Sequence, residues 1–253
     1  MMLKLIFNNF HLTPVLPVLY FQAKKVKASV PDLPEAEGPS GRAGFGNSTL
    51  KLLCIGESTI AGVGVPSHHV GFSGTLAKEL SLLTGCTIEW KVVAKSGYTA
   101  KLVHERLVPK IDFRPDIIVV GLGGNDSFQL NTAQNWTDDI KVLIGCFKSI
   151  NPQAPIFFAN LPPIRLFLAF TPLMRSVLGA RVERLGDALS TTIKEFDQVY
   201  FSNERIDLEI WAKRYDIQVE GNTFFSDGVH PSQLTYQVWA KDMAQLIATH
   251  LNE

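Results

Sequence analysis

Residues 50–59 read LKLLCIGEST, an apolar run that ends at Gly56 and continues into a short polar segment. The run has the length and composition of a buried β-strand, and a glycine directly after it allows a tight turn. A second apolar run, residues 116–121, is rich in β-branched side chains and is also followed by glycines. Strands that are apolar throughout, rather than at alternate positions, predict a parallel sheet that is covered on both faces.

The rest of the chain alternates such strands with amphipathic helices. Apolar side chains recur at helical spacing after Phe72, and Gly85 is a natural end for that helix. Thr137 is a favourable N-cap for a later helix, and Pro231 suits the first position of the last one. The expected elements are strands at 50–55, 88–93, 116–121, 155–160 and 198–201, and helices at 72–83, 137–150 and 232–251. An α/β fold of this kind places its ligands beyond the carboxyl ends of the strands.

Composition limits the domains and the partners. The 253 residues fit one domain, which we place at 49–253, preceded by an N-terminal extension at 1–48. Lysine plus arginine equals aspartate plus glutamate, at 24 each, so the basic surface that nucleic acids require is not expected. The three cysteines are scattered, which favours reduced, packed thiols, and Cys54 in particular should be buried. Nothing in the sequence indicates the oligomeric state.

The N-terminal extension combines apolar and basic residues. Prolines and asparagines interrupt its apolar part, which is too short and too broken for a membrane-spanning helix. Lys24, Lys25 and Lys27 follow the apolar part, the reverse of the order in a secretory signal peptide. We therefore expect a cytoplasmic protein, with a secreted or periplasmic location as the weaker alternative. Residues 1–30 either contact an anionic membrane surface or pack across their own domain, and residues 31–48 form an irregular connector.

Ser58 is the first candidate for chemistry. It follows the strand at 50–55, and glycines on both sides allow a turn that exposes its hydroxyl above the sheet edge. A serine hydroxyl becomes a good nucleophile only when a base accepts its proton and a third group orients that base. Because a serine after a strand is more often a simple turn or capping residue, Ser58 needs partners elsewhere in the chain.

Asp227 and His230 are the candidate partners. They lie three residues apart in the segment SDGVHP, residues 226–231, directly before the last helix. At this spacing the carboxylate can accept the ring N–H that faces away from the serine, which fixes the tautomer of the imidazole. A surface turn and a metal site are the alternatives, but no other cluster in the sequence supplies further metal ligands.

Asn125 is the third candidate. It lies in the segment GGND, residues 123–126, after the strand at 116–121. A side-chain amide at this position can donate to an oxyanion, and one such donor changes the rate by on the order of 10²–10³. A simple Asn-Asp turn is the alternative, and we expect Asp126 to brace the loop rather than to react.

Four segments of the chain resemble, in their order, the four blocks of the SGNH (GDSL-type) hydrolase family. They are the Gly-Glu-Ser turn, the glycine after the second strand, the Gly-x-Asn-Asp loop and the Asp-x-x-His segment. The resemblance covers roughly residues 50–250. It implies a flavodoxin-like three-layer α/β/α sandwich with a central, mostly five-stranded parallel sheet, and it implies neither a metal nor a cofactor. The implied site consists of the nucleophile Ser58 with Asp227 and His230, and of oxyanion donors at the amides of Ser58 and Gly97 and the side chain of Asn125.

Two positions depart from the family pattern. Glu57 stands where the family usually has aspartate, and the family's asparagine shortly before Gly97 is missing. The carboxylate is kept at the first position, so we interpret Glu57 as a subfamily feature. Four of the other histidines are expected to be solvated surface residues, namely His68, His69, His104 and His250.

The segment from Leu161 to Leu178 is the candidate for substrate selection. It follows a strand, so it overhangs the expected cleft as a lid or an acyl-chain wall, or else it is a helix that simply packs on the domain. Its candidate substrate-binding residues are Phe167, Phe170, Leu173 and Met174. A lid of this composition favours a lipophilic acyl or aryl ester over a polysaccharide.

We therefore predict a serine hydrolase that cleaves short to medium acyl or aryl esters through an acyl-enzyme, with a small-molecule ester as its substrate. Carbohydrate O-acetyl esterase, thioesterase and lysophospholipase activities share the same motif residues and remain alternatives. A membrane-associated binding protein that keeps the fold without turnover is the alternative from a different class.

Overall fold

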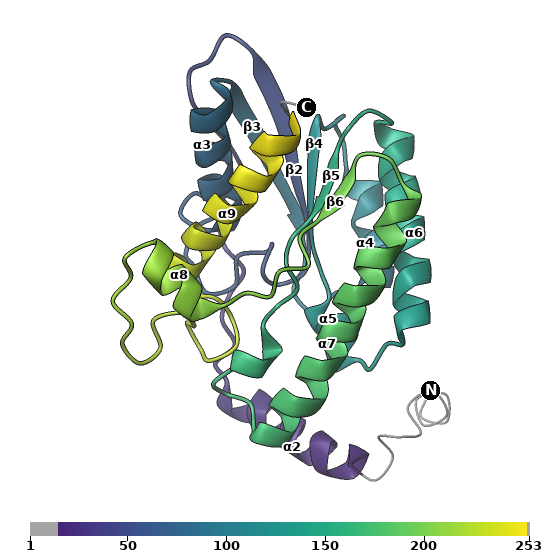
Figure 1. The fold of residues 1–253 in the computed structure, drawn as a ribbon, viewed down its shortest axis with the longest axis vertical. Helices are drawn as coiled ribbons and strands as arrows, with labels where there is room; N and C mark the ends of the chain where they lie inside the picture. The colour runs from purple at the N-terminus through teal and green to yellow at the C-terminus, as the bar shows by residue number, and fades with distance from the viewer. Residues whose placement is uncertain (1–14, 252–253) are drawn as a thin grey trace.

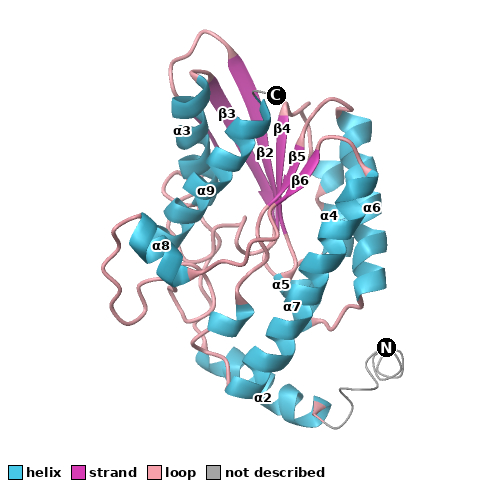
Figure 2. Cartoon of the chain, viewed as in Figure 1, coloured by secondary structure: helices cyan, strands magenta, loops and turns pink. Residues whose placement is uncertain are grey.

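The computed structural model describes residues 15–251, and its centre is a six-stranded sheet in the order β1-β3-β2-β4-β5-β6 (Figures 1 and 2). Five strands, β3, β2, β4, β5 and β6, are parallel to one another, and β1 pairs antiparallel with β3 at the edge. The strands are β1 (Ser40–Ala43), β2 (Thr49–Gly56), β3 (Thr87–Ala94), β4 (Ile117–Gly121), β5 (Ile156–Phe158) and β6 (Val199–Phe201). The predicted parallel sheet is confirmed, with one antiparallel edge strand added.

Helices cover both faces of this sheet. The α-helices are α2 (Leu16–Ser29), α3 (Phe72–Thr84), α4 (Ala100–Arg106), α5 (Gly124–Phe128), α6 (Ala133–Ile150), α7 (Pro172–Thr192), α8 (Leu208–Arg214) and α9 (Gln233–Leu251). Short 3₁₀ turns are η2 (Val108–Lys110), η3 (Ile164–Leu166) and η4 (Ile193–Glu195). Among residues 15–251, none of the helices has both the length and the apolar character needed to cross a membrane.

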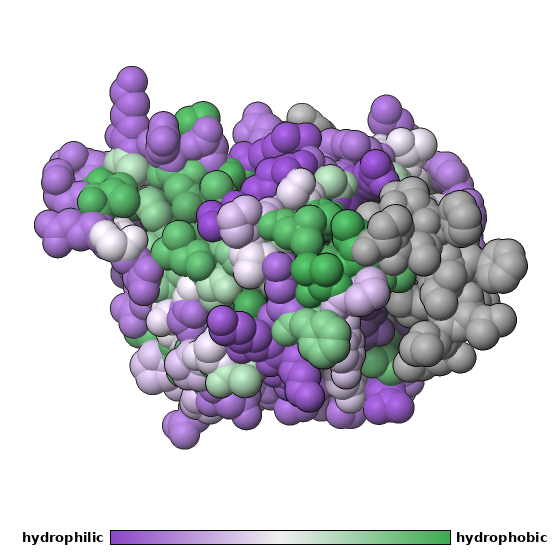
Figure 3. Space-filling model, turned by 90° about the horizontal axis from the view of Figure 1, so that it is seen from below, coloured by the Kyte–Doolittle hydropathy of each residue, from purple (hydrophilic) through white to green (hydrophobic). Residues whose placement is uncertain are grey.

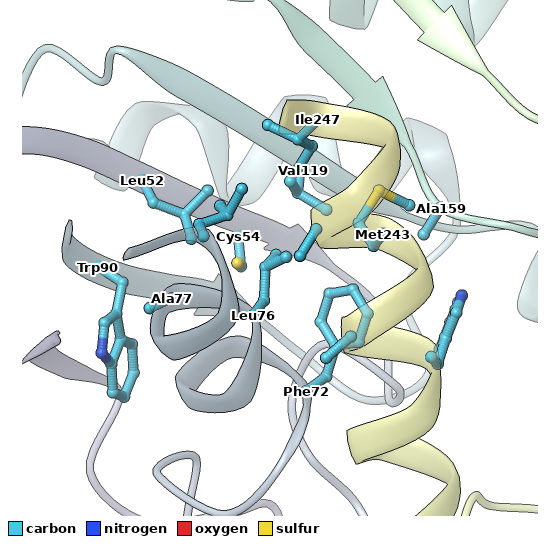
Figure 4. Close-up of a cluster of buried hydrophobic side chains, with 14 of the residues drawn as sticks. Leu52, Cys54, Phe72, Leu76, Ala77, Trp90, Val119, Ala159, Met243 and Ile247 are labelled. Atoms are coloured by element: carbon cyan, nitrogen blue, oxygen red, sulfur yellow. The ribbon is translucent and has the colours of Figure 1, made fainter. Parts of the chain in front are cut away.

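The alternation of side chains along β2 explains the three layers. Leu52 and Cys54 face the core under α3 and α9, while Leu53 and Ile55 face the core under α4, α6 and α7. All four side chains are fully buried, as the uninterrupted apolar run predicts. Figure 4 shows the first of these cores, where residues of β2 and β4 pack against α3 and α9. The predicted α/β/α sandwich is confirmed.

The strand order explains why one edge of the sheet carries the polar loops. The chain passes from β2 to β3 on one side and then to β4 on the other, so the winding direction reverses next to β2. In such sheets a crevice forms outside the carboxyl ends of the strands at this reversal. Gly56 ends β2 in register with Ala94 of β3 and Gly121 of β4, so the loops after all three strands begin at the same level.

A third apolar cluster lies outside the two cores, and we call it the satellite cluster. It joins α2, the segment from η3 into α7, and the loop before α9. Leu19 is the buried residue of α2 in it, and the Thr171 hydroxyl donates to the Gln22 side-chain oxygen at 2.7 Å. Residues 15–29 of the extension therefore pack across their own domain, while residues 1–14 lie outside the described part of the chain. The buried members are Leu19, Ile164, Phe167, Phe170, Met174, Leu178, Val182, Phe224 and Phe225.

Several local predictions need correction. Residues 31–48 are not wholly irregular, because Ser40–Ala43 forms β1. The helix expected to begin at Thr137 begins one turn earlier, since Thr132 caps it by accepting the backbone N–H of Asn135 at 3.1 Å. The last helix begins at Gln233 rather than at 232, so Pro231 stays outside it, in an isolated bridge to Phe225. Gly85 ends α3 in the left-handed conformation, as predicted.

His68 was expected on the surface and is buried instead. Its side chain lies in the loop between β2 and α3, where the ring approaches Gly62, and the residue is 3 % exposed. Burial lowers the pKa of His68 to about 4, so the ring is neutral at physiological pH. The expected burial of Cys54 is confirmed, and all three cysteines are free thiols.

Candidate active site

Ser58 lies in the turn after β2, partly exposed at the carboxyl edge of the sheet. The turn is closed by backbone bonds, since the Ala61 N–H donates to the Glu57 carbonyl at 2.8 Å and the Val63 N–H donates to the Ser58 carbonyl at 3.1 Å. A Cβ on Gly56 would lie 2.0 Å from the carbonyl oxygen of Gly121 on β4. Only glycine fits at that position, so the entry to the turn is set by the close approach of the two strands.

Asp227 and His230 are joined by a hydrogen bond of 2.7 Å between Oδ2 and the ring Nδ1. Oδ1 of Asp227 accepts the backbone N–H groups of Val229 at 2.9 Å and His230 at 2.7 Å. Burial raises the pKa of Asp227, but the donors from His230 and Val229 outweigh it and hold that pKa below its ordinary value. The ionised carboxylate favours the hydrogen on Nδ1, which leaves Nε2 as the acceptor of the ring.

The loop that carries these two residues packs against the first block. Gly64, with φ +104, approaches it so closely that a Cβ would lie 2.5 Å from Ser226 Oγ and 2.7 Å from the Pro231 carbonyl oxygen. Thr59 and Val229, the neighbours of Ser58 and His230 in sequence, line one pocket together with Pro231. The structure thus brings the first and fourth blocks of the sequence to the same place, although more than 160 residues separate them.

Glu57 holds the loop after β4. The residue is 3 % exposed. Oε1 accepts the Gly124 N–H at 2.8 Å, and Oε2 accepts the Asn125 N–H at 2.9 Å together with a hydrogen of the Asn125 side-chain amide. Burial raises the pKa of Glu57 to about 7, although these three donors act against that rise. The position that departs from the family pattern is therefore the one that joins the Ser58 turn to Asn125.

The Asn125 side chain also contacts the loop after β3. Its Nδ2 donates to the Tyr98 carbonyl at 3.2 Å, so both amide hydrogens have acceptors in this structure. Tyr98 directly follows Gly97, which is exposed and has φ +84, a conformation that favours glycine. Three of the sequence blocks, those of Ser58, Gly97 and Asn125, meet around one side-chain amide.

Asp126 makes its side-chain hydrogen bonds to Ala100 and Asn131. It is fully buried, its Oδ2 accepts the Ala100 N–H at 3.0 Å, and its Oδ1 accepts Nδ2 of Asn131 at 2.7 Å. Burial raises the pKa of Asp126 to about 6. These contacts fit the predicted role of a residue that braces the loop, because they tie the start of α4 to the end of the Asn125 loop.

The predicted substrate-binding residues separate into two groups. Phe167 lines the pocket beside Thr59 and Val229. Phe170 and Met174 are buried in the satellite cluster, and Leu173 packs partly buried against it. In this structure the apolar face of the segment therefore packs mainly on the domain. Of the four predicted residues only Phe167 reaches the pocket, which Pro162 and Pro163 of the same segment also line.

The pocket also has wall residues that the sequence motifs do not predict. Its walls include Trp211 of α8, Trp239 of α9 and Phe225 of the loop before α9, and its cavity volume is about 30 Å³. The indole N–H of Trp211 donates to Asp242 at 2.7 Å and that of Trp239 donates to Asn160 at 3.2 Å, so both ring orientations are fixed. Neither tryptophan stands near a motif in the sequence, so only the fold could reveal them.

Comparison with known proteins gives one family match. The model of the GDSL-like lipase/acylhydrolase family matches residues 54–238, a range that includes all four sequence blocks. No curated protein sequence matches the chain closely enough to count as a relative.

Solved structures share the fold at low sequence identity. A protein of Parabacteroides merdae described as a GDSL-like lipase is 19 % identical with a TM-score of 0.61, over 82 % of this chain and 98 % of that one. A family two carbohydrate esterase from Clostridium thermocellum, in complex with cellohexaose, is 19 % identical with a TM-score of 0.56, over 80 % and 65 %. The esterase EstA of a Pseudoalteromonas species, inhibited by monoethylphosphonate, is 16 % identical with a TM-score of 0.54, over 80 % and 99 %.

Proposed function

The chain belongs to the GDSL-like lipase/acylhydrolase family, and on that premise we propose that it hydrolyses carboxylic esters through an acyl-enzyme formed on Ser58. The observation that carries the proposal is the part-buried hydrogen bond between Asp227 and Nδ1 of His230, beside the Ser58 turn. The Ser58 oxygen attacks the ester carbonyl carbon while Nε2 of His230 takes the hydroxyl proton. Asp227 stabilises the imidazolium that forms.

The negative charge of the tetrahedral intermediate falls on the former carbonyl oxygen. The backbone amides of Ser58 and Gly97 and the side chain of Asn125 are the proposed donors to it. The Asn125 hydrogen that contacts the Tyr98 carbonyl is the one that can turn to the oxyanion. Its bond of 3.2 Å to Tyr98 is long, and an oxyanion is a stronger acceptor than a neutral carbonyl. The contacts of Asn125 to Glu57 then keep the amide in place while it donates.

Three proton transfers complete the turnover. His230 gives its proton to the departing alcohol oxygen as the bond between that oxygen and the carbonyl carbon breaks, which leaves the acyl group on Ser58. A water molecule then attacks the acyl carbon while His230 takes one of its protons. The second tetrahedral intermediate collapses, the proton returns to the Ser58 oxygen, and the acid is released.

The pocket favours short acyl groups. Its lining is apolar, and about 30 Å³ admits a few heavy atoms but no long chain without movement of the walls. Trp211 and Trp239 close it, and hydrogen bonds hold both rings. We therefore place acetyl to butyryl esters ahead of long-chain lysophospholipids and thioesters as substrates.

A small acyl pocket also favours a second candidate, the removal of O-acetyl groups from carbohydrates. A solved carbohydrate esterase shares the fold, although at 19 % identity this likeness concerns the fold alone. Rates on acetylated xylo-oligosaccharides and on p-nitrophenyl acetate separate the two candidates. A preference for the sugar of 100-fold or more in kcat/KM would assign the second candidate.

The direct test uses a series of p-nitrophenyl esters from C2 to C12 and an alkyl phosphonate that modifies an activated serine. Turnover should be highest at C2 to C4, and mass spectrometry should locate one phosphonyl group on Ser58. Ser58→Ala should lose both turnover and labelling, whereas Ser149→Ala, at an exposed serine of α6, should keep both. Labelling of another residue, or turnover by Ser58→Ala, would overturn the assignment of the nucleophile.

A further inference from the structure

We propose that α2 binds an anionic lipid surface and holds the catalytic edge of the sheet against it. The binding of α2 to lipid does not depend on the ester chemistry proposed for Ser58, whereas the description of this sheet edge as catalytic rests on that proposed function. The binding to lipid is inferred from the composition and exposure of α2, from the place of α2 in the fold, and from the distribution of apolar side chains over the surface.

The outward side of α2 is apolar in its first half and basic in its second. Val18, Tyr20 and Phe21 are 47 %, 66 % and 69 % exposed, and the two rings contact each other edge to face at 5.7 Å. Lys24, Lys25 and Lys27 follow, all exposed, and α2 contains no acidic residue. Within residues 15–251 none of the three lysines has a carboxylate partner within 4.0 Å, so their charges face solvent.

The inward side of α2 is anchored. Leu19 is 8 % exposed and packs in the satellite cluster, and Gln22 accepts the Thr171 hydroxyl at 2.7 Å. The same cluster contains Phe224 and Phe225 from the loop that continues to Asp227. The helix is therefore fixed to the elements that carry the catalytic histidine, and a surface bound by α2 would lie on that side of the molecule.

Other apolar side chains gather on this side. Phe128 of α5 is 38 % exposed, and Leu166 and Leu168 after β5 are 37 % and 51 % exposed. All three belong to segments that follow the carboxyl ends of strands, and Figure 1 places α2 and α5 at that end of the molecule. Figure 3, seen from that end, shows hydrophobic surface in patches among hydrophilic residues.

The charge pattern of α2 indicates which kind of partner binds its outward side. A protein partner for Val18, Tyr20 and Phe21 would need an apolar groove flanked by acidic groups, whereas an anionic bilayer offers both properties over any area. Aromatic rings insert at the level of the headgroups, and lysines near the surface bind their negative charge. The neutral net charge of the whole chain makes the basic end of α2 a local feature rather than part of a general excess.

The test is flotation of the full-length Ser58→Ala protein with vesicles, so that no turnover occurs. Vesicles of phosphatidylcholine with 30 % phosphatidylserine should bind the protein, and pure phosphatidylcholine should bind it at least about ten-fold more weakly. The triple variant Lys24→Glu/Lys25→Glu/Lys27→Glu should lower binding about 100-fold, since each lysine near an anionic surface contributes roughly a five-fold change. The double variant Tyr20→Ser/Phe21→Ser should lower it about ten-fold.

Two controls make the result specific. Phe45→Ser removes a fully exposed aromatic ring from the loop before β2, at the opposite edge of the sheet, and should bind like the parent protein. A chain without residues 1–14 should also keep its binding. Three results would each overturn the proposal. The α2 variants could bind vesicles as well as the parent protein, or binding could be lost only when residues 1–14 are removed. The protein could also form a dimer in solution that the α2 variants dissociate. Unchanged melting temperatures of the variants would show that they are folded.

Discussion

The exchange Asp227→Asn tests the proposed base more sharply than removal of the histidine. Oδ1 accepts two backbone N–H groups, at 2.9 Å and 2.7 Å, and the amide oxygen of asparagine can keep both. Only Oδ2, which faces Nδ1 of His230 at 2.7 Å, becomes an NH₂ group. The loop should therefore keep its shape while the ring is forced to accept at Nδ1 and to carry its hydrogen on Nε2, where it can no longer take the serine proton.

The expected magnitude follows from this change of tautomer. The same exchange in a serine protease triad lowers kcat by about 10⁴, which corresponds to about 5.4 kcal/mol of transition-state stabilisation. KM should change by less than about three-fold, because the pocket walls are not altered. Since the backbone bonds remain, the loss in the free energy of unfolding should stay below about 2 kcal/mol, or a few degrees in Tm.

The assay is steady-state hydrolysis of p-nitrophenyl acetate, with the melting curve recorded on the same preparation. Asp112→Asn is the matched control, because it removes one charge from an exposed ion pair with Lys91 and does not touch the site. A folded Asp227→Asn protein that keeps more than a tenth of the parent kcat would refute the role of Asp227. A large fall in Tm would show instead that the carboxylate mainly holds the loop.

Four further variants have expected outcomes. Glu57 has a native pKa of about 7 against an ordinary 4.5, so the native state binds the proton more tightly between these values and the free energy of unfolding should fall as pH rises through this window. Glu57→Gln cannot ionise and should remove about 3 kcal/mol of that fall, which urea unfolding at pH 5 and pH 8 would measure. Trp211→Leu should widen the pocket and raise the ratio of octanoate to acetate kcat/KM about ten-fold. An unchanged ratio would show that the pocket does not select the acyl group. Gly56→Ala should destabilise the protein by about 3 kcal/mol or more, because its Cβ would meet the Gly121 carbonyl at 2.0 Å. Gly145→Ala, in a helix with nothing within 4 Å, should instead stabilise by up to about 1 kcal/mol in the same melting experiment.

The sequence predicted the parallel strands and both cores because each depends on a local pattern. The run from Leu52 to Ile55 is apolar at every position, and only a strand covered on both faces requires that. The loops carrying Ser58, Gly97 and Asn125 each follow a strand of this sheet, and they share one edge because parallel strands end together. The loop with Asp227 could be assigned only through its resemblance to a family, because no local rule places a loop near the end of the chain beside the first strand.

Other features depend on contacts between distant segments. Thr132 and Thr137 are both good N-caps, and tertiary packing decides between them, since Trp136 must be inside the helix to reach the core beneath it. His68 is polar in sequence, but the fold buries it. The pocket proposed to hold the acyl group depends on Trp211 and Trp239, which come from two helices and meet only in the folded chain.

The antiparallel strand β1 affects how the protein can be shortened. Its pairing from Ser40 to Ala43 covers the outer edge of β3, an eight-residue strand whose backbone N–H and C=O groups would otherwise face solvent. A long, uncovered edge strand is a template for pairing between molecules, and so for aggregation. At the other edge β6 has only three residues and offers little such template. Because the family match begins at residue 54, a chain trimmed to that match would lose the cover that β1 gives to β3. The shortest truncated protein expected to remain monodisperse therefore includes residues 40–43.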